Sequence, residues 1–124
     1  MKAALVVLIV DDEPLLLRAL VRMLRSDGIE AIGVANGALA LEALADASFD
    51  LVLSDVRMPV MDGPTLLRHL RARGDAAPPL VFLTGYADDS DGTLLAAGAK
   101  AVCGKPTDPD ELVTIVRRHA RAPG

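Results

Sequence analysis

The stretch FDLVLSDVRMP, residues 49–59, decides how the rest of the chain is interpreted. Residues 49–53 have the length of a strand and are mostly large and apolar, which is typical of a strand covered on both faces. The run ends at one carboxylate, Asp55, and Pro59 and the pair Asp62-Gly63 then mark a loop. Ligands of open parallel sheets bind at the carboxyl ends of the strands. The stretch therefore predicts a reactive carboxylate at a strand end, with a simple turn-starting Asp55 as the alternative.

Composition sets limits on the class of protein. The 124 residues fit a single domain, 1–124, and 52% of them are hydrophobic. A net charge of −4 and no basic cluster argue against direct binding of nucleic acid. The single cysteine, Cys103, excludes an intramolecular disulfide, predicts a small buried hydrophobic residue, and indicates a cytoplasmic location. The first apolar run is too short to span a membrane and lacks a cleavage site.

Strand and helix signals alternate five times along the chain. Strands are predicted at residues 5–10, 30–34, 49–53, 80–83 and 100–103. Helices are predicted at residues 14–26, 36–46, 64–74, 88–97 and from 109 onward, the last with Asp108 as its cap. On the first helix, Arg18, Arg22 and Arg25 share a face, which is interpreted as solvated. Five β-then-α units predict a doubly wound α/β domain with helices on both faces of a parallel sheet.

Polar residues follow four of the predicted strands. They are Asp11 and Asp12 after the first strand, Asp55 after the third, Thr84 after the fourth and Lys105 after the fifth. Carboxylates within ~4 Å of one another repel by roughly 4 kcal/mol per pair at an effective dielectric near 20. A cluster of this kind needs a counter-ion, and an all-oxygen site suits Mg²⁺. Together with a lysine and a hydroxyl, the cluster predicts a site where Asp55 accepts a phosphoryl group whose oxygens Thr84 and Lys105 bind.

These signals resemble one family along essentially the whole chain, the receiver domain of two-component response regulators. No single motif is specific, but their order and their positions at strand ends are. The matching segments are Asp11-Asp12-Glu13, Asp55-x-x-Met58-Pro59-x-Met61-Asp62-Gly63, Thr84-Gly85, Gly98-Ala99 and Lys105-Pro106.

The resemblance implies a flavodoxin-like, five-stranded parallel sheet in the order 2-1-3-4-5 with five helices. It implies Asp55 as the phosphoacceptor, and Mg²⁺ (or Mn²⁺) bound by Asp12, Asp55 and the backbone carbonyl of Arg57, with Asp11 acting through a water. The donor would be the phosphohistidine of a sensor histidine kinase or a phosphotransfer protein. The domain would switch the surface that it presents to an output domain or effector, as a monomer or weak dimer without a membrane partner. A cis Lys105–Pro106 peptide is also implied.

One departure from the family affects switching. The aromatic residue that usually stands three positions before the lysine is replaced by Val102. A valine has one rotatable side-chain bond and cannot present two different surfaces. Tyr86, two residues after Thr84, is therefore expected either to carry the signal or to shield the site.

Two other functions remain as alternatives. A Mg²⁺-dependent phosphohydrolase would use the same aspartyl-phosphate, but it needs an acid two residues after Asp55, where this chain has Arg57. A receiver-like module that only binds partners would not need every acidic, hydroxyl and lysine position filled. The sequence leaves open whether the chain stands alone or is part of a longer protein, and it does not identify the kinase or the output.

Overall fold

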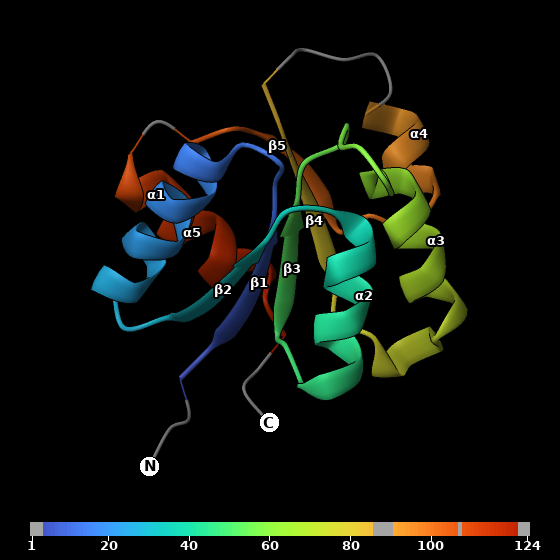
Figure 1. The fold of residues 1–124 in the computed structure, drawn as a ribbon, viewed down its shortest axis with the longest axis horizontal. Helices are drawn as coiled ribbons and strands as arrows, with labels where there is room; N and C mark the ends of the chain where they lie inside the picture. The colour runs from blue at the N-terminus through green and yellow to red at the C-terminus, as the bar shows by residue number, and fades with distance from the viewer. Residues whose placement is uncertain (1–3, 86–90, 107, 122–124) are drawn as a thin grey trace.

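The computed structural model describes residues 4–85, 91–106 and 108–121 (Figure 1). Five parallel strands form one sheet in the order β2-β1-β3-β4-β5, and this confirms the predicted fold class and strand order. The strands are β1 (Val6–Val10), β2 (Glu30–Val34), β3 (Leu51–Ser54), β4 (Leu80–Thr84) and β5 (Ala101–Gly104). The helices are α1 (Pro14–Ser26), α2 (Gly37–Asp46), α3 (Gly63–Ala72), α4 (Asp91–Ala96) and α5 (Pro109–His119), with a short 3-10 turn at Gly74–Ala76.

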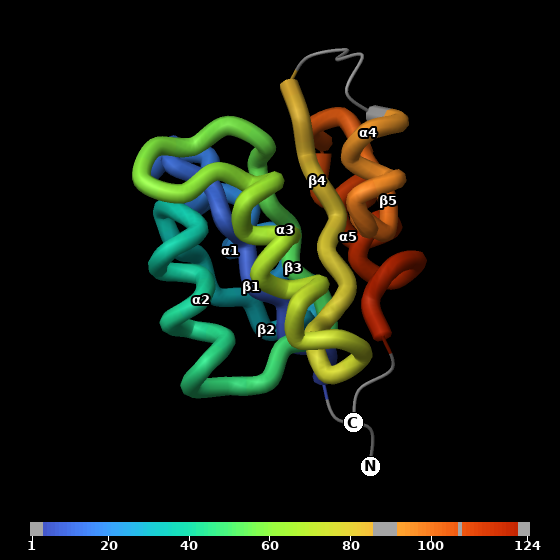
Figure 2. The backbone as a smooth tube through the Cα atoms, turned by 90° about the vertical axis from the view of Figure 1, so that its right-hand side faces the viewer, coloured from blue at the N-terminus to red at the C-terminus, as the bar shows by residue number. Residues whose placement is uncertain are grey.

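The helices cover both faces of the sheet. Helices α1 and α5 lie on one face, and α2, α3 and α4 lie on the other (Figures 1 and 2). Each face buries its own apolar cluster, built almost entirely from aliphatic side chains, with Phe49 and Phe82 as the large exceptions. Within the described ranges, no helix has both the length and the apolar character needed to cross a bilayer.

Local sequence signals explain where the helices begin. Asn36, Asp62 and Asp108 each accept a hydrogen bond from a backbone N–H in the first turn of the helix that follows, at 2.9 Å. The predicted first and last residues of the helices and strands differ from the observed ones by at most two positions, apart from helix 88–97. That helix is observed as Asp91–Ala96, and positions 88–90 lie outside the described residues.

Strand register brings the four strand ends to one edge. Val10 is paired with Ser54, and Thr84 with Gly104. The ladder continues one residue further on each side, because Asp55 N–H donates to the Val10 carbonyl at 2.9 Å and Lys105 N–H donates to the Thr84 carbonyl at 2.9 Å. The residues directly after β1 and β3 therefore start side by side, and Lys105 starts beside the end of β4.

The cap of α3 makes stability depend on pH. The Thr65 side chain and backbone N–H hold the pKa of the Asp62 carboxyl below its ordinary value of 3.8. Because the folded pKa is depressed, the stabilisation is present above the unfolded pKa and is lost as pH falls through the folded pKa. We expect Asp62→Ala to cost about 0.5–2 kcal/mol at neutral pH. Asp62→Asn should keep the cap. It should remove only the part of the acid-induced loss of stability, below about pH 4, that protonation of the Asp62 carboxyl causes. Urea unfolding of the three proteins from pH 7 to pH 3 checks this, and parallel curves for parent and Asp62→Asn would contradict it.

Candidate functional site

Three carboxylates meet at the carboxyl edge of the sheet. Asp11, Asp12 and Asp55 each offer an oxygen, and these oxygens all lie within 4.8 Å of one another. Asp11 is 3% exposed, Asp55 is half-buried and Asp12 is exposed, so the cluster opens to solvent on the Asp12 side. At 4.8 Å two such charges repel by roughly 3 kcal/mol at an effective dielectric near 20. The predicted convergence of these three residues is confirmed.

Lys105 reaches into the same cluster from the end of β5. Its Nζ lies 3.3 Å from Asp11 Oδ2 and 3.4 Å from Asp55 Oδ2. The lysine side chain is 23% exposed, so its charge is only partly screened by water. One ammonium faces three carboxylates, which leaves the site with an excess of negative charge.

Burial and neighbouring charges shift the pKa values of Asp55 and Lys105. Burial and the Asp11 carboxylate raise the pKa of Asp55 above its ordinary value, although Lys105 and the Val56 N–H act in the opposite direction. Burial alone would lower the pKa of Lys105, but the carboxylates of Asp11 and Asp55 outweigh it and raise that pKa. Burial is the largest cause of the raised pKa of Asp55 and the Asp11 carboxylate adds to it, so the opposing effect of Lys105 does not fully offset these two.

The cluster has the chemistry of a hard-cation site. Mg²⁺ binds carboxylate oxygens while keeping several waters, and an open side of the cluster leaves room for them. Asp11 Oδ1 accepts the Glu13 N–H at 2.9 Å, and Asp55 Oδ1 accepts the Val56 N–H at 2.8 Å. These bonds orient both carboxylates so that each Oδ2 faces Lys105. The residues present therefore fit a divalent cation.

The loop after β3 is held in place by contacts that the sequence did not reveal. The buried Ser54 donates its hydroxyl to the Asp55 carbonyl at 2.8 Å. Val60 has a φ of 70°, and the Met61 N–H donates to the Pro59 carbonyl at 2.8 Å, so Val60 is the centre of a strained γ-turn. The Met61 carbonyl in turn accepts the Gly37 N–H at 3.1 Å, which ties the loop to the start of α2.

Ser54 could have been found from its place directly before Asp55, where a small hydroxyl can turn back onto the chain. The γ-turn at Val60 has no sequence signal, because a β-branched residue is disfavoured at positive φ.

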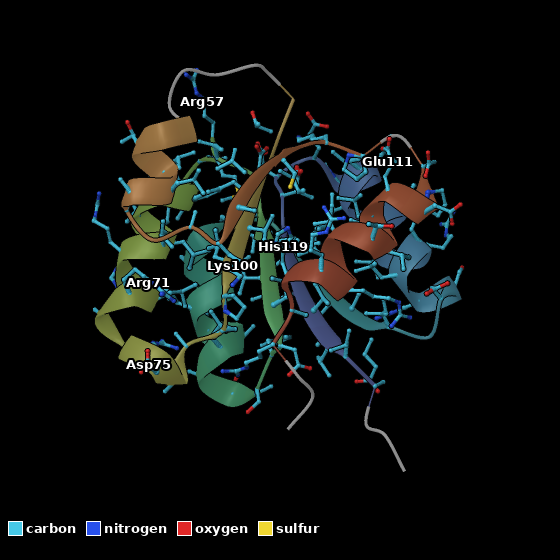
Figure 3. All side chains as sticks on the ribbon, turned by 180° about the vertical axis from the view of Figure 1, so that it is seen from behind. Arg57, Arg71, Asp75, Lys100, Glu111 and His119 are labelled. Atoms are coloured by element: carbon cyan, nitrogen blue, oxygen red, sulfur yellow. The ribbon has the colours of Figure 1, made fainter. Side chains whose placement is uncertain are left out.

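The other predicted site residues lie at or near this edge. Thr84 is half-buried at the end of β4, beside Gly104 of β5. Arg57 is exposed and lies at the end of the molecule where the strands finish (Figure 3). Val102 is partly buried and packs against the cluster on the α3 side of the sheet. Tyr86 lies outside the described residues.

Two expectations about β5 need correction. The Lys105–Pro106 peptide is trans, since the described residues contain no cis bond, so the predicted cis peptide is wrong. Lys105 reaches both carboxylates without it, because the residue extends the β4–β5 ladder and its long side chain turns back over the sheet edge. Cys103 is a free thiol and only partly buried rather than fully so, since β5 is an edge strand with one side uncovered.

Comparison with known proteins gives matches along most of the chain. The family model described as the response regulator receiver domain matches residues 7–117. The DNA-binding response regulator MtrA of Mycolicibacterium smegmatis is 40% identical over 116 residues, which make up 93% of this chain and 50% of MtrA. The chain thus spans half the length of that relative.

Two solved structures share the fold. The chemotaxis protein CheY4 of Vibrio cholerae aligns with a TM-score of 0.87 at 30% identity and covers 94% of this chain and 99% of its own. The receiver domain of the sensor histidine kinase PA1611 of Pseudomonas aeruginosa aligns with a TM-score of 0.83 at 33% identity, covering 94% and 98%. The PA1611 structure has a magnesium ion coordinated in its active site cleft.

Proposed function

This chain belongs to the receiver domain family of two-component response regulators, and from that premise we propose that Asp55 accepts a phosphoryl group in a Mg²⁺-dependent reaction. The observation that carries the proposal is the meeting of the Asp55 carboxylate with those of Asp11 and Asp12 and with the Lys105 ammonium at one sheet edge. The family is a signalling family, and Asp55 serves here as an acceptor rather than as the nucleophile of a phosphohydrolase.

The proposed reaction is one displacement at phosphorus. A carboxylate oxygen of Asp55 forms a P–O bond while the P–N bond of the donor phosphohistidine breaks, and the imidazole leaves with the electron pair of that bond. Bound Mg²⁺ supplies positive charge for the phosphoryl oxygens, and Asp12, Asp55 and the Arg57 carbonyl would hold it, with Asp11 acting through a water. Lys105, at 3.4 Å from Asp55 Oδ2, pairs with a second phosphoryl oxygen, and the Thr84 hydroxyl donates to a third.

The partners follow from the donor chemistry. The proposal implies a sensor histidine kinase or a histidine phosphotransfer protein as donor, with the cytoplasm as the place of reaction. Because MtrA is named as DNA-binding and the chain spans half of it, an output domain that binds DNA is one proposed recipient of the signal. This chain itself has a net charge of −4, so the receiver would act on DNA only through that recipient.

The test of the proposed function is labelling by a small donor. The purified domain is incubated with acetyl phosphate, with and without Mg²⁺, and its intact mass is measured. The expected result is a gain of one phosphoryl group per chain, only with the cation. No labelling in the presence of Mg²⁺ would contradict the proposal, and rapid turnover of a small phosphoester would favour the phosphohydrolase alternative.

Mg²⁺ is expected to stabilise the folded domain. At a concentration of 100 times Kd a ligand that binds only the native state adds about 2.7 kcal/mol, which for a domain of this size is roughly 10 °C in Tm. Asp12→Ala should remove most of this rise, because it deletes the exposed carboxylate of the cluster. The matched control is Asp75→Ala, an exposed carboxylate at the opposite end of the molecule (Figure 3). The rise in Tm on adding Mg²⁺ is measured by thermal denaturation. Equal rises for Asp12→Ala and Asp75→Ala would contradict the assignment of Asp12 as a Mg²⁺ ligand.

The signal of phosphorylation is expected to pass through the segment after β4. Val102 cannot swing between two surfaces, so phosphorylation should move residues 84–89 and the start of α4 more than β5. Amide chemical shifts with and without a phosphoryl mimic such as beryllofluoride would measure this. Shifts larger at Val102 than at Tyr86 would refute it. If the loop responds, Tyr86→Ala then separates a shielding role, seen as faster dephosphorylation, from a signalling role, seen as a lost response in α4.

A further inference from the structure

A groove runs between α1 and the edge strand β2, and the phosphoacceptor chemistry makes no use of it. Its volume is about 610 Å³. Its lining consists of three arginines, Arg18, Arg22 and Arg25, together with Leu17, Val21, Ser26 and Gly33. A Cβ at Gly33 would lie 2.8 Å from Leu17 Cγ, so the helix packs directly onto the strand backbone there. We name this feature the α1–β2 groove.

The strand beside the groove has backbone groups that pair with no other strand. Glu30 N–H donates to the Leu5 carbonyl at 2.9 Å, and the Val34 carbonyl accepts the Asp11 N–H at 3.1 Å. Alternate residues of a parallel strand bond to opposite sides, so Ala31 and Gly33 direct their N–H and C=O groups away from β1. The sheet ends at β2, so no further strand pairs with these groups. Gly33 is half-buried and Ala31 is only 1% exposed, so side chains cover the backbone groups of Ala31.

Arg25 covers part of that edge. Its Nε and Nη2 donate to the Ala31 carbonyl at 3.2 and 2.9 Å. An exposed sheet edge readily pairs with another chain, and a charged side chain over the edge is one way in which proteins restrain such pairing. Arg25 is itself exposed, so an incoming strand could displace its guanidinium from the Ala31 carbonyl.

The charge of the groove indicates what would bind there. Arg18, Arg22 and Arg25 make no ion pair with a carboxylate in the part of the chain that the structure describes, and no acidic residue lines the groove. This arginine row stands out on a chain with a net charge of −4. An acidic ligand would therefore find complementary charge in this groove.

We propose that the α1–β2 groove binds an extended acidic segment of a partner protein, which adds to β2 as a further strand. The backbone of the segment pairs with Ala31 and Gly33, its carboxylates pair with Arg18, Arg22 and the displaced Arg25, and its apolar side chains pack on Leu17 and Val21. Nucleic acid fits less well, because it offers no strand-like backbone for the free edge. A second copy of β2 brings only Glu30 as a carboxylate.

The test uses a defined probe, a short capped peptide of alternating glutamate and valine with a fluorescent label. Anisotropy titration at low salt should show saturable binding that weakens as salt rises, and the amide signals of Ala31 and Gly33 should shift on binding. The double variant Arg18→Gln with Arg22→Gln should weaken binding about fivefold, because two exposed ion pairs are lost. The matched control, Arg68→Gln with Arg73→Gln, removes two exposed arginines of the α3 region and should bind as the parent does.

Backbone pairing is tested separately from charge. The same peptide with N-methyl groups on the amides that would face β2 keeps its charge and should not bind. Three results would overturn the proposal: no shift at Ala31 and Gly33, equal binding of the N-methylated peptide, or concentration-dependent shifts at β2 without peptide. The second result would mean simple attraction of a polyanion, and the third would mean a second copy of this chain. None of these results depends on whether Asp55 is phosphorylated.

Discussion

Asp55→Asn is expected to give a folded domain that takes no phosphoryl group from acetyl phosphate in the presence of Mg²⁺. The amide has nearly the shape of the carboxylate and can still accept the Val56 N–H at the Oδ1 position. It lacks the nucleophilic carboxylate oxygen, so the P–O bond cannot form. Removing a charge from a site that holds three carboxylates and one ammonium also relieves repulsion. Intact mass spectrometry should show a complete loss of labelling, while the free energy of unfolding stays the same or rises.

The matched control for this variant is Asp62→Asn. Asp62 lies on the same loop and is exposed, but its side chain caps α3 and is not one of the three carboxylates of the acid cluster. We expect it to label at the rate of the parent. If Asp55→Asn were labelled as well as Asp62→Asn, the phosphoryl group would be on another residue, and Asp12 would be the next candidate to substitute.

Gly63→Ala is expected to lower both stability and phosphorylation. A Cβ at this position would be pressed against the Asp55 carbonyl oxygen and would lie 2.5 Å from Cε1 of Phe82, which is fully buried. The Gly63 N–H is held by the Val56 carbonyl at 2.9 Å, so the backbone cannot move aside without losing that bond. Overpacking of this kind costs about 1–3 kcal/mol. A displaced Asp55 should also label more slowly, by roughly 10-fold to 100-fold.

Gly92→Ala is the control for this second prediction. Gly92 lies within α4, and an added Cβ would meet no atom within 4 Å. Alanine is a better helix former by about 1 kcal/mol, so this variant should be as stable as the parent or more stable. Urea unfolding and acetyl phosphate labelling of both variants give the answer. A Gly63→Ala domain with parental stability would show that the β3–α3 loop adapts more readily than its contacts indicate.

Much of the fold could be predicted because its signals are local. The apolar runs, the prolines in the first turns and the Asp108 cap act within a few positions, and each helix or strand is predicted within two residues of where it begins and ends, apart from α4. The candidate site could also be predicted in outline, since the carboxyl ends of parallel strands must meet at one edge. For that reason the sequence predicts that Asp11, Asp12, Asp55 and Lys105 meet at one sheet edge.

The sequence by itself determined the strand order through its family resemblance, and it determined which residue types stand at the sheet edge. The tertiary structure decided which of them are buried: Asp11 is 3% exposed while its neighbour Asp12 is exposed. It decided that Lys105 reaches the acids while the Lys105–Pro106 peptide stays trans, that Gly63 must lack a side chain beside Phe82, and that Arg25 covers the Ala31 carbonyl of β2. These features join residues from different elements, or depend on how the chain turns between them. Local sequence preferences carry no information on such distances, which the register of the sheet and the packing of the helices set.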